Sequence, residues 1–378
     1  MYSPKYITDI MKVAGLSDDD KKRLAEVQKK FAFRANEYYL SLINWDDPAD
    51  PIRKLVIPDP AELEEWGQLD TSKEAKYVVG PGMEHKYEQT ALVLVSDMCA
   101  GFCRYCFRKR LFMEKESREI ARDIDADVDY ISSHPEITNV LLSGGDPLFL
   151  STKQLKKIVS RISKIEHIKI IRIGTKIPAY NPFRILNDPR LPEMIRKAAM
   201  KDKKIYVVTQ FNHPRELTEP AIKAINILQE AGAVFANQTP VLHGINDDPE
   251  TIAKLFRKLS FIGVAPYYVF QCRPTLGNRH FVVPIEEAYF ILEKAKMNCS
   301  GLAKRFTFAM SHVTGKIAIV GVDDERTYMK YQQAANWEDI GKFMSFRRDP
   351  KALWFDDYTK LLSVKRVADE DVPRTHSS

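Results

Sequence analysis

Residues 96–110 read SDMCAGFCRYCFRKR and hold three of the five cysteines of the chain. Cys99, Cys103 and Cys106 follow the spacing Cys-x3-Cys-x2-Cys, so all three fall on one tight loop. Three thiolates on such a loop can hold three corners of a metal centre and leave a fourth position open for a group that is not protein. The chemistry expected of the chain depends on which centre this loop holds.

Three kinds of centre use a cysteine loop in different ways. A zinc site usually takes four protein ligands, often as two Cys-x2-Cys pairs, and Cys272 and Cys299 do not supply such a pair. A thioredoxin-like redox pair would use Cys103 and Cys106 but would give no role to Cys99. An iron–sulfur cluster with one iron not bound by protein uses all three cysteines of the loop.

The composition is that of an ordinary globular protein, with 378 residues, 44% hydrophobic and 29% charged. No apolar run is long enough to cross a bilayer, and the N-terminus lacks the apolar segment of a secretory signal. We therefore expect a cytoplasmic protein, where clustered cysteines bind metal or do redox chemistry. The net charge of +6 is modest and spread along the chain, so we expect neither nucleic acid nor a membrane as a partner.

Six short apolar runs alternate with helical segments on both sides of the cysteine loop and beyond it. Strands are expected at 90–95, 138–142, 168–173, 204–208, 234–236 and 264–270. Helices are expected at 116–133, from the N-cap Ser151, at 192–200, at 218–232 and at 249–261. This alternation predicts parallel βα units. Six units fit a partial (β/α)6 TIM-like barrel and also a doubly wound sheet.

A polar cluster follows each of the six expected strands. These clusters include the cysteine loop, Ser143 to Asp146, Gln210 to His213, Gln238 and Arg273. Any strand must end in turn residues, which explains glycine and proline but explains glutamine, histidine and arginine less well. Because the carboxyl ends of parallel strands meet at one edge, the clusters predict one shared cavity.

The two flanks of the barrel carry weaker patterns. Residues 1–85 are expected to form a helical extension, with a helix over 18–42 and a loop over 47–60. This extension is expected to serve as a cap or as a contact in a homo-oligomer. Residues 86–282 form the expected barrel. Residues 283–378 are expected to be an α+β extension with a helix at 284–297, a hairpin of strands 305–309 and 316–320, a tail from 323 that wraps back on the barrel, and disorder over 372–378.

The cysteine spacing, with an aromatic residue just before the last cysteine (Tyr105), resembles the radical S-adenosylmethionine (SAM) superfamily. The resemblance implies that Cys99, Cys103 and Cys106 hold a 4Fe–4S cluster whose open iron binds SAM. It implies that one electron, from a reductant such as flavodoxin or ferredoxin, cleaves SAM to a 5′-deoxyadenosyl radical. This radical abstracts hydrogen from a small-molecule substrate. The fold implied is a partial six-stranded βα barrel.

Further motifs are similar, in order, to the lysine 2,3-aminomutase branch of this superfamily. They are DMC (97–99), CRYC (103–106), LSGGD (142–146), RIG (172–174), FNHP (211–214), NQ (237–238), GIND (244–247), YY (267–268), QC (271–272) and GNRHF (277–281). The resemblance implies SAM contacts at Ser143, Gly144, Gly145, Asp146, His213 and Gln238. It also implies that Arg108 holds the substrate carboxylate, which suits a planar guanidinium.

The same branch uses pyridoxal phosphate (PLP) on a C-terminal lysine, for which Lys316 is the candidate. The glycine-rich run before that lysine is absent here. Lys86 and Thr90 stand where the branch has arginines for the PLP phosphate, which removes strong charge-assisted contacts. A surface lysine in a hairpin turn is the alternative interpretation of Lys316.

Two aspartates bind the distal ammonium of lysine in this branch, and this chain lacks both. Arg273 stands at the first position and an uncharged residue, near Ala309, at the second. An arginine facing a lysine ammonium is repulsive. We therefore expect an amino-acid-like substrate other than lysine that carries a carboxylate or another anion.

Three hypotheses follow from these motifs. The first is an aminomutase that uses SAM, the cluster and PLP on a substrate other than lysine. The second is a PLP-independent radical SAM enzyme on the same scaffold, with a different hydrogen abstraction. The third is a non-catalytic iron–sulfur or zinc protein, which would make poor use of Gly144, Gly145 and Asp146.

Overall fold

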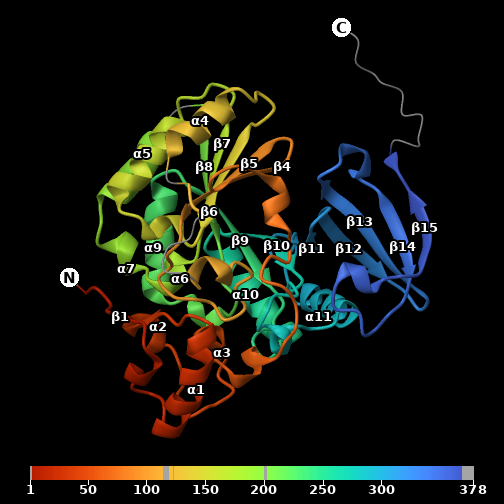
Figure 1. Ribbon diagram of the computed structural model, residues 1–378, viewed down its shortest axis with the longest axis horizontal. Helices are drawn as coiled ribbons and strands as arrows, with labels where there is room; N and C mark the ends of the chain where they lie inside the picture. Colours follow the sequence, from red (N-terminus) through yellow and green to blue (C-terminus); the bar gives the residue numbers. More distant parts are fainter. Residues whose placement is uncertain (1, 114–118, 122, 200–201, 368–378) are drawn as a thin grey trace.

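The computed structural model describes residues 2–113, 119–121, 123–199 and 202–367, and the strands of this part form two sheets. The larger sheet has thirteen strands, and its centre is the predicted barrel (Figure 1). The six central strands are β5 (Thr90–Ser96), β6 (Asn139–Gly144), β7 (Ile170–Thr175), β8 (Lys204–Thr209), β9 (Val234–Pro240) and β10 (Ala265–Phe270). Each pairs in parallel with the next.

The strand order separates the two architectures that the sequence left open. The central strands follow one another in chain order without a reversal, whereas a doubly wound sheet reverses its order at a switch point. β5 and β10 are not paired with each other, so the barrel is open between them. The partial (β/α)6 barrel is therefore confirmed.

Helices follow the barrel strands and lie outside them (Figure 1), but the one expected over 116–133 begins only at Ile124, since residues 119–121 and 123 are not helical. The helices are α4 (Ile124–Ser132), α5 (Thr152–Ile162), α8 (Arg190–Ala199), α9 (Glu219–Glu230), α10 (Pro249–Phe261) and α11 (Ile285–Met297). The N-cap predicted at Ser151 is confirmed, and Thr218 and Asp248 accept from the first turns of α9 and α10 in the same way. Residues 116–118 and 200, at the ends of two expected helices, lie outside the described residues. Two short helices, α6 (Ile177–Tyr180) and α7 (Phe183–Leu186), were not expected.

The expectation of one long helix over 18–42 is wrong. Helix α1 (Asp18–Lys30) ends at Phe31, and β2 (Ala35–Asn36), which pairs with β1 (Tyr6–Ile7), precedes a short α2 (Glu37–Leu40). Asn36 causes the break, because its side-chain amide donates to the carbonyls of Ala100 and Tyr180 and its oxygen caps α2. These bonds tie the N-terminal helices to the cysteine loop.

The expected loop over 47–60 instead contains α3 (Pro51–Val56). Asp50 caps this helix by accepting from Ile52 N and Arg53 N, and Pro51 takes the first helical position. Aspartate followed by proline is a helix-start signal as well as a turn signal, which is why the composition alone predicted a loop.

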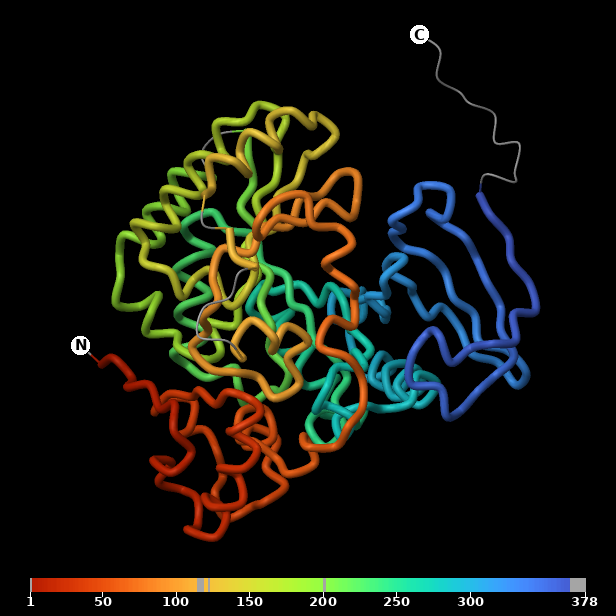
Figure 2. Tube along the Cα trace, in the orientation of Figure 1, coloured from red at the N-terminus to blue at the C-terminus, as the bar shows by residue number. Residues whose placement is uncertain are grey.

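Antiparallel strands flank the barrel on both sides. Before β5 come β3 (Val78–Gly80) and β4 (Met83–Tyr87), so the sheet begins ahead of the boundary expected at residue 85. The chain reaches them along residues 60–77, drawn in orange in Figure 2, which pass from the N-terminal helices to the barrel. After β10 comes β11 (Thr307–His312), which is parallel to β10.

The predicted hairpin is confirmed, with the turn at Val313 and Thr314 between β11 and β12 (Gly315–Val322). The tail then adds β13 (Arg326–Ala334), β14 (Phe343–Arg347) and β15 (Leu361–Lys365) to the same sheet. These strands extend the sheet away from the barrel (Figure 1), but residues 352–353 return to it, because Gln271 Nε2 donates to Leu353 O and Ile285 N donates to Ala352 O. The expected wrap-back is thus met by this segment and not by the strands. Residues 372–378 lie outside the described residues. No helix in the described ranges has the length and apolar character needed to cross a membrane.

Candidate active site

A cavity of about 340 Å³ lies at the carboxyl ends of the parallel strands. Its wall contains every site residue that the sequence nominated except His213, namely Cys99, Cys103, Cys106, Arg108, Ser143, Gly144, Gly145, Asp146, Gln238, Arg273 and Lys316. These residues come from five different strands or the loops that follow them, namely β5, β6, β9, β10 and β12. The polar clusters at the strand ends therefore do face one shared space.

The cysteine loop presents three free, partly buried thiols to the cavity. Burial, and then the neighbouring acidic groups, raises the pKa of the Cys99 thiol well above its ordinary value and that of Cys106 to about 11. Three thiolates so close together need a cationic centre. Among the described residues no three His, Cys, Asp or Glu side chains converge on a single ion.

Buried contacts to the N-terminal helices hold the loop in place. Arg104 forms an ion pair with Glu62 at 2.7 Å, and the two side chains are 3% and 0% exposed. Arg104 Nη1 also donates to the carbonyl of Ala32, and Phe102 N donates to the carbonyl of Arg34. Tyr180 Oη donates to Cys103 Sγ at 3.2 Å from the opposite side.

The end of β6 packs directly against the start of the cysteine loop. A Cβ on Gly144, where φ is +115°, would lie 2.3 Å from the carbonyl oxygen of Ser96, and one on Gly145 would lie 2.5 Å from that of Met98. Gly145 N donates to Ser96 O, and Asp146 N donates to Met98 O at 2.8 Å. Both glycines therefore have a packing role, beside the SAM contact that the resemblance implies.

Asp146 is held by the protein itself. Its carboxylate accepts from Thr175 Oγ1, Lys176 N and Leu148 N, at 2.7–2.9 Å. Burial raises the pKa of Asp146 to about 6, against the effect of these hydrogen bonds. The carboxylate thus joins the ends of β6 and β7 beside the cluster loop.

The two remaining SAM candidates differ in position. Gln238 lines the cavity, and its side-chain amide has no hydrogen-bond partner within the described ranges. His213 lies off the cavity wall, where it is 9% exposed and its Nδ1 accepts from Arg215 N. The geometry thus leaves the Gln238 amide free for a ligand, whereas the SAM contact of His213 stays a prediction.

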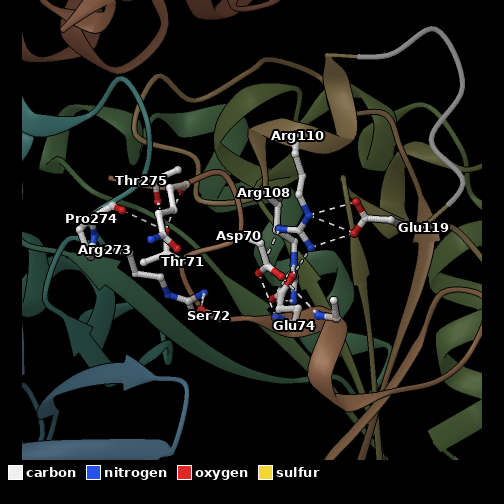
Figure 3. A network of polar contacts seen from close by, with 12 residues as sticks. Asp70, Thr71, Ser72, Glu74, Arg108, Arg110, Glu119, Arg273, Pro274 and Thr275 are labelled. Atoms are coloured by element: carbon white, nitrogen blue, oxygen red, sulfur yellow. Dashed lines mark hydrogen bonds and ion pairs between the residues drawn. The ribbon is translucent and has the colours of Figure 1, made fainter. Parts of the chain in front are cut away.

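Arg108 is already paired with a carboxylate. Its Nε and Nη2 donate to Glu74 at 2.8–3.1 Å, and its Nη1 donates to Ser143 Oγ at 3.0 Å (Figure 3). Arg110 adds a second ion pair to Glu74, at 2.6 Å. Although burial opposes it, Arg108 holds the pKa of Glu74 at about 2.

Residues 68–77, which contain Glu74, belong to the extension expected to serve as a cap or an oligomer contact, and part of this segment also lines the cavity. Ser72, Glu74 and Tyr77 line the cavity, as does Glu84 on β4. The segment crosses to the loop after β10, where Thr71 Oγ1 donates to Pro274 O and Arg273 Nη1 donates to Ser72 Oγ (Figure 3). Tyr77 Oη reaches the carbonyl of Val313 in the β11–β12 turn. The segment carries no recognisable motif, so the sequence held no signal for this role.

Lys316 is on strand β12, not in the turn, and its ammonium group faces the cavity. Its Nζ lies 4.5 Å from the ring centre of Tyr268 and 6.0 Å from that of Tyr87. Burial, and then Arg172, Arg273 and Lys86, lowers the pKa of Lys316 to about 7. The interpretation as a surface lysine in a turn is therefore wrong.

Four cations of the cavity wall form no ion pair with a carboxylate of the described chain: Lys86, Arg172, Arg273 and Lys316. Lys86 Nζ donates to His312 O, and Arg172 Nε donates to Asn139 Oδ1. Arg273 lies over the Phe107 ring at 3.6 Å. Burial lowers the pKa of Lys86 to about 8 and that of Arg273 to about 10. These four cations give this part of the cavity wall an excess of positive charge.

Comparison with known proteins agrees with the site. The model of the radical SAM superfamily matches residues 93–256. A protein of Aquifex aeolicus (strain VF5), provisionally named L-lysine 2,3-aminomutase, is 52% identical over 360 residues, which are 95% of this chain and 96% of that protein. The L-lysine 2,3-aminomutase of Clostridium subterminale is 35% identical over 78% of this chain and 70% of its own length. The glutamate 2,3-aminomutase of Clostridioides difficile (strain 630) is 34% identical over 79% and 70%.

These matches extend beyond the barrel to both flanks of the chain, and membership of this superfamily implies a 4Fe–4S cluster and SAM. The three cavity-facing cysteines and the free amide of Gln238 fit that pair of groups. The chain belongs to the radical SAM superfamily, in its lysine 2,3-aminomutase-like family, and is an enzyme of the aminomutase-like type.

Proposed function

We propose that this enzyme moves an amino group between neighbouring carbons of an amino acid that carries a second anionic group, with PLP bound at Lys316. The position of Lys316 carries the proposal. It faces the cavity without a carboxylate partner in the described chain, and its pKa of about 7 leaves much of the amine neutral at physiological pH. A neutral amine is the form that attacks an aldehyde, and lysines are activated in this way by burial and by neighbouring cations.

The residues around Lys316 fit a phosphate-bearing cofactor. Lys86 and Arg172 supply cationic donors near it, although Lys86 replaces one arginine of the relatives and Thr90 the other. Bound there, PLP would carry the migrating amino group, while SAM on the cluster of Cys99, Cys103 and Cys106 would supply the hydrogen-abstracting radical. The chain itself orients the substrate between these two ends of the cavity.

The charges of the wall support an acidic substrate. Glu74 occupies the Nε and Nη2 edge of Arg108, so Arg108 reaches a substrate α-carboxylate only through its Nη1 edge. Among the described residues Arg273 has no such partner, and its guanidinium is held by Phe107 and Ser72. A second carboxylate fits Arg273, whereas the ammonium of lysine would be repelled there. A relative named for glutamate exists in the same family, alongside the relatives named for lysine.

The test of the PLP site is borohydride reduction of the anaerobically reconstituted enzyme, followed by peptide mass spectrometry. We expect a reduced pyridoxyl adduct on Lys316 and none in Lys316→Arg, which keeps the charge but cannot form the imine. If no adduct forms while dithionite still releases 5′-deoxyadenosine, the enzyme is the PLP-independent radical SAM enzyme of the second hypothesis. If neither is seen in a cluster-loaded sample, the chain is not a catalyst of this type.

The expected homo-oligomer, the reductant, the cytoplasmic location and the division at residues 85 and 282 stay predictions. Size-exclusion chromatography with light scattering checks the first of them. Replacing dithionite by reduced flavodoxin or ferredoxin checks the second.

A further inference from the structure

Glu84 is a buried acid in the cavity wall that the proposed chemistry does not use. It lies on β4 and is 6% exposed, and its carboxyl group faces the cavity. It makes no hydrogen bond or ion pair with any residue of the described chain. A carboxyl group buried in this way is costly unless something binds it, and the cavity is where that partner must come from.

Five charged groups from four parts of the chain interact electrostatically with Glu84. Glu74 stands before β3, Lys86 is on β4 itself, Arg108 and Arg110 follow the cysteine loop, and Arg273 follows β10. Arg108 and Arg110 already have acidic partners, since Glu74 pairs with both of them and Glu119 also pairs with Arg110. Burial, and then Glu74, raises the pKa of Glu84 to about 7, although Arg108, Arg110 and Arg273 oppose this. Near neutral pH the carboxyl group therefore exists in both forms, and the protonated form has an O–H to donate.

Arg273 and Lys86 indicate whether the ligand group that binds Glu84 is positively or negatively charged. Neither is paired with a carboxylate of the described chain, and both lie close enough to Glu84 to act on its charge or to be acted on by it. A ligand ammonium bound to ionised Glu84 would face both cations. A ligand carboxylate bound by Arg273 would meet a neutral donor in protonated Glu84, in an arrangement without repulsion.

We propose that Glu84 is a substrate-binding residue, which in its protonated form donates a hydrogen bond to the distal carboxylate that Arg273 binds. This inference rests on the proposed acidic substrate and adds the residue that makes its binding depend on protonation. Substrate binding then takes up a proton. Ionised Glu84 repels the incoming carboxylate, so affinity falls as pH rises through the pKa of Glu84.

The expected size of the pH effect on affinity follows from the fraction of enzyme in which Glu84 is protonated. Apparent affinity is reduced by that fraction, so a group that titrates near neutrality weakens binding about fivefold between pH 7 and pH 8. Glu84→Gln keeps a neutral donor of nearly the same shape. It should bind as tightly as the wild type does at low pH and show no such dependence. Glu84→Ala should bind about tenfold more weakly than Glu84→Gln at every pH, because the loss of one hydrogen bond to a charged group is of this size.

The decisive measurement is calorimetric titration of glutarate into the cluster- and SAM-loaded enzyme at pH 6.5, 7 and 8, in two buffers of different ionisation enthalpy. Glutarate has both carboxylates but no amino group, so its binding does not depend on Lys316 or on turnover. We expect proton uptake on binding in the wild type and none in Glu84→Gln. Glu88→Gln, an exposed acid after β4, is the matched control and should behave as the wild type does.

Three results would overturn the inference: no glutarate binding at pH 6.5, a pH dependence that survives in Glu84→Gln, or lysine binding that strengthens with pH and is lost in Glu84→Gln. The last would mean that ionised Glu84 binds an ammonium.

The proposed function is judged separately. Glutarate binding with proton uptake but without turnover of glutamate or aspartate would refute the acidic-substrate aminomutase and leave the role of Glu84 intact. Turnover of glutamate, with the same pH dependence of binding in Glu84→Gln as in the wild type, would support the acidic-substrate aminomutase and refute the role of Glu84.

Discussion

The two ends of the cavity are built in opposite ways. At the cluster end the protein satisfies its own polar groups, since Asp146 accepts from three neighbours and Arg104 is paired with Glu62. At the other end, Lys316, Arg273 and Glu84 line the cavity without ionic partners in the described chain. Satisfied groups fix the shape of a site before any ligand arrives. Unsatisfied groups select the ligand that completes them.

The largest expected effect tests the cluster end. Cys103→Ala should lower 5′-deoxyadenosine release more than about 1,000-fold, because a cluster corner is lost and the radical cannot be generated. The measurement is chromatography of the product after anaerobic reconstitution, together with iron content. Cys299→Ala, a buried cysteine outside the cavity, should retain the cluster. Equal iron and activity in Cys103→Ala would show that the loop does not hold the centre.

Loss of the buried ion pair should be the largest effect on stability. Arg104→Ala leaves Glu62 buried without its partner, which should cost about 3–5 kcal/mol of unfolding free energy. Urea denaturation of the reconstituted enzyme measures it. Lys29→Ala breaks an exposed pair with Glu26 and should cost less than about 1 kcal/mol. Similar costs in both variants would mean that the loop is held by something other than Arg104.

A substitution at the substrate end of the cavity should change substrate preference rather than stability. Arg273→Asp should lower the ratio of kcat/KM for glutamate to that for lysine by about 100-fold, because it removes one attraction and adds one repulsion, each worth about a factor of ten. Steady-state kinetics with both amino acids measures this. Arg196→Asp, an exposed position on α8, serves as the control. An unchanged preference in Arg273→Asp would remove Arg273 from the substrate site.

The smallest effect concerns the proton of Lys316. Below its pKa of about 7 the amine is protonated, so the rate of imine formation with pyridoxal phosphate should fall about tenfold for each pH unit and should level off above pH 8. Stopped-flow absorbance, with the cluster spectrum subtracted, follows the imine. A profile centred near about 10.4, the ordinary lysine value, would show that the amine is not activated by its surroundings.

The sequence predicted the cluster end well, for a physical reason. The loop cysteines and the Ser143–Asp146 stretch are short contiguous motifs on one fold, and hydrophobic runs locate all six parallel strands. The partners at the other end come from distant parts of the chain, such as Glu74 and Arg108 or Ser72 and Arg273. Neither Glu74 nor Glu84 belongs to a motif, and no local pattern reports that its carboxyl group is buried.

The tail shows a related limit. Strands β13–β15 pair in sequence onto β12 and so join the same sheet as the barrel. The tail from residue 323 is rich in charged and aromatic residues, and this composition did not indicate its strands.

The open gap between β5 and β10 limits how short an active fragment of the chain can be. Residues 68–77 cross to both rims of this gap, through Glu74 to Arg108 on one side and through Ser72 to Arg273 on the other (Figure 3). A fragment that starts after residue 85 would keep every strand of the barrel and every cysteine. It would lack Ser72, Glu74 and Glu84, and so would present a radical centre with one wall of its chamber missing. Such a fragment would retain the three loop cysteines but not the segment that lines this side of the cavity.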